Sequence, residues 1–323
     1  MRVLVTGGAG YIGSAVVEEL RSRGHVPIVY DNLTYHSYYP AAGASFVYGD
    51  IRDTPRLSAL AAECDATIWL AAIVGDAACQ VDPHATLAIN YHALEHHLAA
   101  HPYTHQRLVF ASSCSVYGYQ DGLLNEASPC DPLSEYARLK LAAEPLMHNH
   151  DAVILRFGTA FGAPLGFCRP RLDLAINRMA VRGAARGVID VCGGEQWRPW
   201  ASIRDLAYAV CQALNYRIPP GTYNIASENA TLGDAAARIA ETLEPLHIVL
   251  DERPADDPRN YHVDTSAAKL LGLILPEPLC TIEDAARELA LLVLSGRIPD
   301  WRDALFVNAA WLKQRGTPCR LNV

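Results

Sequence analysis

The chain opens with Val3-Leu4-Val5-Thr6-Gly7-Gly8-Ala9-Gly10-Tyr11-Ile12-Gly13, and this stretch decides the fold class. Its first four residues form an apolar run that predicts a buried strand, and a helical pattern follows at residues 14–23. Between the two, glycines recur every three residues, which permits a tight turn and a close approach of the backbone to a diphosphate. The start of the helix adds N–H groups and the positive end of its dipole. The stretch therefore predicts a dinucleotide site at Gly7, Gly10, Tyr11, Ile12 and Gly13.

Asp31 ends the second predicted strand, at residues 26–31. A carboxylate at this point can hold both hydroxyls of the adenosine ribose and would repel a 2′-phosphate. No Arg or Lys occurs between Gly24 and Ile51 to bind such a phosphate, so the sequence favours NAD over NADP. Asp50 and Ile51 follow the third predicted strand, where they either flank the adenine or form an ordinary strand end.

Strands and helices alternate through the first half of the chain. Apolar runs predict strands at residues 3–6, 26–31, 45–48, 66–71, 107–113 and 152–157. Amphipathic stretches predict helices at residues 14–23, 54–63, 83–100 and 136–148. This alternation predicts a Rossmann-type, doubly wound parallel α/β sheet with right-handed crossovers.

The later part of the chain is less regular. Helices are predicted at residues 172–182, 203–214, 231–243 and 282–294, with Thr231 as an N-cap, and a strand at 222–226. We expect an NAD-binding domain at residues 1–160, with interleaved later segments near 200–228. Residues 161–323 are expected to form mostly a smaller α/β substrate-binding domain.

Composition excludes several classes of function. The 323 residues are 50% hydrophobic and carry a formal net charge of -8, which disfavours disorder, nucleic-acid binding and polybasic membrane binding. No apolar run is long enough to span a membrane, and the first strand leaves no room for a signal peptide. Nine cysteines without a C-x-x-C pair predict free thiols in a reducing cytoplasm.

Tyr136 and Lys140 are four residues apart on a predicted helix and therefore share a face. A lysine beside a phenol lowers its pKa and makes a base that is usable near neutral pH. Ser113 ends the fifth predicted strand, at the sheet edge where ligands bind, and it either bonds a substrate oxygen or caps a turn. Cys114 has no neighbouring base that would make it a nucleophile.

These motifs resemble a known family. The glycine motif, Asp31-Asn32-Leu33, the run from Ser112 to Gly118 and Tyr136-x-x-x-Lys140 are similar to extended short-chain dehydrogenases/reductases. The resemblance is to the NAD-dependent type that epimerises or dehydrates nucleotide sugars. It runs from residue 1 to about residue 285 and is strongest in the first 160.

The resemblance implies a Ser113, Tyr136 and Lys140 catalytic set, NAD as the cofactor and a nucleotide-diphosphate sugar as the substrate. It implies further cofactor contacts from Asn32, Leu70, Ala71, Ala72, Asn90 and Phe157, besides Tyr136 and Lys140 themselves. Implied substrate contacts are Val74, Ser113, Thr159, Arg171, Arg198, Arg253, Arg259 and Tyr261. Each arginine has the alternative of a surface ion pair, Tyr261 of a core position, and Asn90 of a plain helix residue.

Three departures from the family pattern narrow the function. Dehydratases of the family usually place Asp-Glu after the catalytic Ser or Thr, and Cys114 and Ser115 stand there, which disfavours dehydration. Residues 70–76 lack the lysine that usually touches NAD, and Thr159 stands where asparagine is common. The last two features, with residues 171–174, are more similar to a branch that oxidises or epimerises nucleotide-linked sugars, heptoses included.

The helix at residues 83–100 and the turn after it carry His84, His92, His96, His97, His101 and His105. Two pairs have the spacing of zinc ligands, but no third ligand recurs at a useful spacing, so no metal is expected. We expect a solvated or interface helix, because the resemblance implies a homodimer through the helices near 83–100 and 136–148.

The sequence thus predicts an NAD-dependent nucleotide-sugar 4-epimerase that works through a 4-keto intermediate. The alternative is a 4-dehydrogenase or 4-keto reductase of the same family, which shares the same residues. A non-catalytic NAD-binding regulator is disfavoured by the intact Ser113, Tyr136 and Lys140 set.

Overall fold

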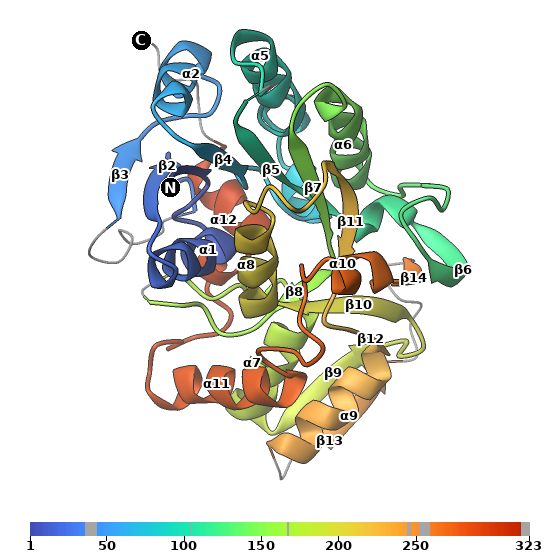
Figure 1. Cartoon of the computed structure of the whole chain (residues 1–323). Helices are drawn as coiled ribbons and strands as arrows, with labels where there is room; N and C mark the ends of the chain where they lie inside the picture. Colours follow the sequence, from blue (N-terminus) through green and yellow to red (C-terminus); the bar gives the residue numbers. More distant parts are fainter. Residues whose placement is uncertain (36–43, 104, 167, 244–246, 252–258, 318–323) are drawn as a thin grey trace.

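The computed structural model describes residues 1–35, 44–103, 105–166, 168–243, 247–251 and 259–317. Its main feature is a seven-stranded sheet in the order β11-β7-β5-β4-β1-β2-β3 (Figure 1). All its strand pairs are parallel, so the doubly wound α/β fold is confirmed. The strands are β1 (Arg2–Thr6), β2 (Val26–Asp31), β3 (Ser45–Tyr48), β4 (Ala66–Trp69), β5 (Arg107–Ser113), β7 (Ala152–Phe157) and β11 (Gly221–Ile225).

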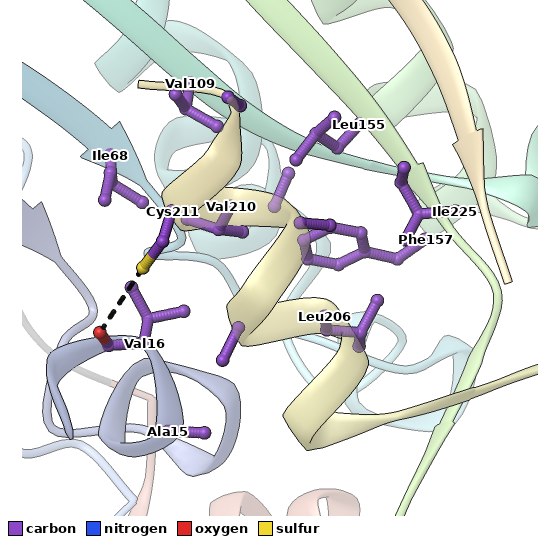
Figure 2. Close-up of a cluster of buried hydrophobic side chains, with 14 of the residues drawn as sticks. Ala15, Val16, Ile68, Val109, Leu155, Phe157, Leu206, Val210, Cys211 and Ile225 are labelled. Carbon is purple, nitrogen blue, oxygen red and sulfur yellow. Dashed lines mark hydrogen bonds between the residues drawn. The ribbon is translucent and has the colours of Figure 1, made fainter. Parts of the chain in front are cut away.

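Helices cover both faces of this sheet, which explains why its central strands are apolar throughout. One face packs against α1 (Tyr11–Ser22) and α8 (Ile203–Gln212). Figure 2 shows Leu206, Val210 and Cys211 of α8 filling the space between α1 and the strands. The other face packs against α2 (Thr54–Ala62), α4 (Pro83–Leu87), α5 (Ala93–Ala100) and α6 (Glu135–Ala143).

Three predicted elements differ from the structure in an informative way. The fourth strand ends at Trp69 instead of residue 71, so residues 70–75 form a loop at the sheet edge. The helix predicted at 83–100 contains a π-helical turn, η1 (Ala88–His92), between α4 and α5. The helix predicted at 136–148 ends as the 3₁₀ turn η3 (Glu144–Met147), because Pro145 lacks the N–H that would continue the α-helix.

A second group of elements lies below the main sheet in Figure 1. It contains a three-stranded sheet of β12 (Glu228–Thr231), β10 (Trp197–Ser202) and β8 (Thr159–Phe161), and the parallel pair of β13 (His247–Asp251) and β9 (Val188–Cys192). Its helices are α7 (Ala175–Arg186), α9 (Leu232–Thr242) and α11 (Ile282–Leu294). A capping box at the start of α9 confirms Thr231 as its N-cap. The short strands were not predicted, because three to six partly polar residues carry no clear period.

Two late segments return to the first half of the chain. The strand β14 (Asn260–Val263) pairs with β6 (Tyr119–Leu124), which follows the 3₁₀ turn η2 (Cys114–Tyr117). The helix α12 (Asn308–Arg315), which follows the 3₁₀ turn η4 (Ala304–Phe306), packs against the short helix α3 (Asp76–Cys79). The remaining short helix, α10 (Ser266–Leu270), lies against β11.

Within the described ranges, no helix is long and apolar enough to cross a membrane. The eight cysteines of those ranges are free thiols, as the sequence predicted for them.

Candidate active site

A cleft of about 760 Å³ opens at the carboxyl ends of β1, β4, β5 and β7. Its wall includes every residue predicted to bind the cofactor except Asn90. It also includes all the predicted substrate residues that the structure describes, whereas Arg253 lies outside the described residues. Residues chosen from separate motifs in the sequence are therefore brought to one cavity.

The glycine-rich loop leaves no room for side chains. Gly7 has a φ of +72°, and a Cβ there would lie 2.7 Å from the Ala71 nitrogen. A Cβ on Gly13 would lie 2.2 Å from the Gly7 oxygen. No side chain caps the start of α1. The loop and the first turn of α1 thus form a backbone cradle that fits a dinucleotide diphosphate.

Two carboxylates are fixed on the side of the cleft where the sequence predicts the adenosine. Asp31 accepts hydrogen bonds from the Leu33 nitrogen at 2.8 Å and from the Ala9 nitrogen at 3.1 Å. Burial raises the pKa of Asp31, while these backbone donors oppose the shift. Asp50 is buried, yet hydrogen bonds from Arg52 hold its pKa below the ordinary value. Both side chains are therefore oriented before any ligand binds.

Ser113, Tyr136 and Lys140 line one wall of the cleft. Ser113 ends β5, and its hydroxyl caps η2 by accepting from the Ser115 nitrogen at 3.2 Å. The interpretation of Ser113 as a turn cap is confirmed, and its bond to a substrate oxygen stays a prediction. Tyr136 and Lys140 lie in successive turns of α6, with the Lys140 Nζ 5.9 Å from the centre of the Tyr136 ring.

The protonation of this group differs from the sequence prediction. Burial raises the pKa of Tyr136, Cys79 and Asp76 add to the shift, and Arg171 opposes it. The net direction is the reverse of the expected lowering, because burial outweighs any effect of Lys140, whose Nζ donates to the Ala111 oxygen at 2.6 Å. Burial also lowers the pKa of Lys140 to about 8. Both side chains are thus biased toward their neutral forms.

Buried arginines line the opposite side of the cleft. Arg198, on β10, is 4% exposed and donates to the Trp197 oxygen at 2.8 Å and to the Arg259 oxygen. Arg171 holds Asp173 through two hydrogen bonds of 3.1 and 3.0 Å. Arg259 forms an ion pair with Asp76 at 3.4 Å. The ion pairs that the sequence left open for Arg171 and Arg259 do exist, but they line the cleft instead of the outer surface.

Thr159, Val74 and Tyr261 complete the predicted substrate wall. Tyr261 is only 3% exposed and packs in a small core with Tyr117 and Val263. Its ring also lies 5.9 Å from the Arg198 guanidinium carbon. Tyr261 is therefore both a core residue and a residue of the cleft wall.

Asn90 is the one predicted cofactor residue that does not line the cleft. Its side-chain oxygen accepts from the Ile73 nitrogen and its amide group donates to the Ile73 oxygen, both at 2.8 Å. It lies behind the loop of residues 70–75 and does not line the cleft. Both of its polar groups bond that loop, and a direct contact of Asn90 with the cofactor stays a prediction.

The cleft contains residues that sequence reasoning missed, namely Tyr35, Asp76, Arg169, Arg178 and Asn308. Arg169 stands two positions before Arg171, and this spacing was the one feature of the sequence from which Arg169 could have been predicted. Asn308 carried no signal, because it lies beyond the end of the family resemblance.

The histidine-rich segment is partly a core segment. His97 is fully buried and bonds Tyr103 Oη at 2.8 Å and Ser58 Oγ at 3.1 Å, so a solvated role for it is wrong. The rings of His92 and His96 stack at 6.0 Å. Among the described residues, no group of three or more His, Cys, Asp or Glu side chains could hold a metal ion. The homodimer through these helices stays a prediction.

Comparisons with known proteins agree with this geometry. Residues 3–226 match the profile of the NAD dependent epimerase/dehydratase family. The chain is 33% identical over 300 residues to a UDP-glucose 4-epimerase of Halalkalibacterium halodurans, covering 84% of this chain and 89% of that protein. It is 26% identical to the UDP-glucose 4-epimerase of Brucella ovis in complex with NAD, with a TM-score of 0.77 over 90% of this chain and 97% of that chain. The structure of MoeE5 in complex with UDP-glucuronic acid and NAD is also 26% identical, with a TM-score of 0.76 over 92% of this chain and 100% of that chain.

Proposed function

This chain belongs to the NAD-dependent epimerase/dehydratase family, and within that family we propose that it is a nucleotide-sugar 4-epimerase. The observation that carries the proposal is the convergence of Ser113, Tyr136 and Lys140 on one wall of a cleft. The same cleft is bounded by the glycine-rich loop and by the buried Arg198. A sugar oxygen, a hydride acceptor and a diphosphate can thus be held together.

Each member of the proposed catalytic set has a distinct task. Tyr136 takes the proton from the sugar 4-hydroxyl as the hydride leaves C4, and it returns a proton when the 4-keto group is reduced from the other face. Ser113 donates to the same sugar oxygen and orients it. NAD, when bound, supplies the hydride acceptor, and the positive charge of its oxidised form favours the Tyr136 phenolate. Lys140, held by the Ala111 oxygen, adds a positive charge beneath the Tyr136 ring when it is protonated.

The residues after Ser113 support epimerisation over dehydration. Cys114 is fully buried, its Sγ donates to the Arg156 oxygen at 3.1 Å, and burial raises the pKa of its thiol. Ser115 is also buried and donates to Ser113 Oγ at 2.9 Å. Neither side chain can act as the acid or base that water elimination requires.

The experiment that tests the proposal is NMR of the protein with a panel of UDP-, GDP-, ADP-, CDP- and dTDP-sugars, heptoses included. We expect one sugar nucleotide to be converted to its C4 epimer without accumulation of NADH. Stoichiometric NADH, or a free keto sugar, would instead identify the net 4-dehydrogenase of the same family. If no sugar nucleotide is turned over, the enzymatic proposal is wrong.

The Tyr136→Phe substitution tests the role of Tyr136 in proton transfer. Loss of the phenolic proton carrier should lower turnover by about 10²- to 10⁴-fold, while the NAD affinity changes little. The control is Tyr119→Phe, because Tyr119 is 57% exposed and lies outside the cleft. Near-normal turnover of Tyr136→Phe would remove Tyr136 from the mechanism.

A further inference from the structure

Arg169 is a buried cation in the cleft that the proposed reaction does not use. It lies between β8 and α7, is 7% exposed and lines the cavity. Its guanidinium donates to the Leu305 oxygen at 2.8 Å and to the side-chain oxygen of Asn308. These two partners come from the last segment of the chain, more than 130 residues later. The fold therefore uses neutral acceptors to hold a charged side chain in place.

The charges around Arg169 do not balance. Arg169, Arg171 and Asp173 contribute two positive charges and one negative charge, and Asp173 is already held by both arms of the Arg171 guanidinium. Within the described ranges, no carboxylate lies at ion-pair distance from Arg169. Burial and the neighbouring Arg171 lower the pKa of Arg169 to about 10. A buried guanidinium without a counter-ion is costly, so this position is suited to an incoming anion.

The surroundings of Arg169 place it beside the glycine-rich loop. The preceding residue, Cys168, directs its Sγ to the Ala9 oxygen at 4.0 Å. On the other side, the Arg169 guanidinium lies 5.0 Å from the centre of the Tyr35 ring. The Tyr35 hydroxyl is buried and has no hydrogen-bond partner among the residues that the structure describes. In this described part of the chain, a guanidinium without a carboxylate partner and a hydroxyl without a hydrogen-bond partner thus meet next to the backbone cradle at the start of α1.

The loop across the cleft supplies no competing cation. Residues 70–76, which follow β4, contain neither lysine nor arginine. Asn308 connects this loop to Arg169, because its amide group donates to the Val74 oxygen at 3.0 Å while its oxygen accepts from Arg169. The backbone of Asn308 also donates to Asp173 at 3.3 Å. Asn308 is 2% exposed and is therefore a rigid junction of three parts of the cleft wall.

We propose that Arg169 binds the diphosphate of NAD, with the Tyr35 hydroxyl as a second donor, and that Asn308 is the positioning residue for Arg169. The last segment of the chain is then part of the cofactor site. A guanidinium suits this role because its planar donor fork matches phosphate oxygens. The inference rests on NAD binding and not on the sugar or the reaction, so its failure and that of the epimerase proposal are distinguishable.

The test is isothermal titration of NAD and of adenosine into full-length protein freed of bound cofactor. Arg169→Gln should weaken NAD binding by about ten- to a hundredfold, Arg169→Lys by less, and neither should change adenosine binding. The affinity of Arg169→Gln for NAD should also depend less on ionic strength than that of the native protein. Arg297→Gln is the matched control, because Arg297 bonds the Gly166 oxygen of the same loop at 2.9 Å from an exposed position.

A second titration identifies which diphosphate Arg169 meets. UDP is added to each variant after saturation with NAD, and its affinity should be unchanged in Arg169→Gln. A loss confined to UDP would assign Arg169 to the sugar nucleotide and overturn the proposal, as would an unchanged affinity for both ligands. If thermal melting shows that Arg169→Gln is not folded, the same two titrations are made with Arg169→Lys.

A double-mutant cycle tests the role of Asn308. Asn308→Ala should weaken NAD binding by about three- to tenfold in the native background and have no further effect in the Arg169→Gln background. Equal losses in both backgrounds would show that the Asn308 side chain acts through Val74 and not through Arg169.

Discussion

The two halves of the cleft are built in opposite ways. The cofactor half is formed largely by the backbone of consecutive β–α units, from Gly7 to Ala72. The proposed sugar half is formed by side chains from β5, α6, β8, α7, β10 and β14. A site made by contiguous chain can be recognised from spacing alone, whereas a site made by remote side chains requires the fold. Arg169 belongs to the second kind although we assign it to the cofactor.

The largest effect that we expect is on NAD affinity, from a substitution in the glycine-rich loop of the cofactor half. Gly13→Ala places a Cβ 2.2 Å from the Gly7 oxygen and 2.7 Å from the Gly8 Cα, so the loop must move. We expect NAD affinity to fall by about a hundredfold or more, or about 2.7 kcal/mol, as measured by titration.

The control for this change is Gly24→Ala. Gly24 also has a positive φ, +76°, but open space surrounds its Cβ position. The Gly24→Ala substitution should lower the free energy of unfolding by about 1 kcal/mol and leave NAD affinity unchanged. If Gly13→Ala bound NAD normally, the cofactor half would not depend on its backbone cradle.

A smaller effect is expected on the sugar side from Arg198→Gln. Losing a buried guanidinium should raise the KM for the sugar nucleotide by about ten- to a hundredfold, with a smaller change in kcat and none in NAD affinity. Steady-state kinetics measures the changes in KM and kcat, and titration measures the NAD affinity.

Arg204→Gln is the matched control, since Arg204 follows β10 and pairs with Glu288 at 2.7 Å on the partly exposed surface. Its KM should stay within about twofold of the native value. A loss of NAD affinity in Arg198→Gln would contradict the division of the cleft into two halves.

The smallest effect concerns Lys140, which stands where the halves meet. Its pKa in the folded protein, about 8, lies below its ordinary value of 10.5. Between these values the unfolded chain binds more protons than the folded chain, so Lys140 contributes stability that rises with pH. From about pH 7 to about pH 9, the native protein should gain about 1 kcal/mol of unfolding free energy relative to Lys140→Met.

This difference is measured by chemical denaturation of both proteins at each pH. The comparison between variants is necessary because buried phenols and thiols, such as Tyr30 and Cys211, have raised pKa values and shift stability the other way. A difference between the two proteins that does not change with pH would mean that the Lys140 pKa is not depressed.

The sequence predicted the main sheet well because its strands are apolar and its turns carry glycine. Five of the six strands predicted for the first half end within one residue of their positions in the structure. The pairing of Tyr136 with Lys140 was also predictable from their spacing on one helix face, and the place of Ser113 from the common edge at which parallel strands end. The position of Asn90 was not, because a helix period tells which face a residue is on but not which loop its amide will meet.

The protonation of the site could not be predicted from the sequence, because it depends on burial and on neighbouring charges. Tyr136 and Lys140 were correctly brought together, but their pKa shifts depend on how completely the fold removes water from both groups. The same limit applies to His97, because burial lowers its pKa to about 4 in a helix that the sequence predicted to be solvated or at an interface.

The sequence by itself determined the doubly wound sheet, the backbone cradle for the dinucleotide and the preference for NAD. These features depend on local spacing, on glycine conformation and on one carboxylate at a strand end. Only the tertiary structure decided the pairing of β6 with β14, the burial of the arginines and the return of Leu305 and Asn308 to Arg169. The physical reason is that contacts between remote segments are set by the packing of the whole chain, which no local pattern records.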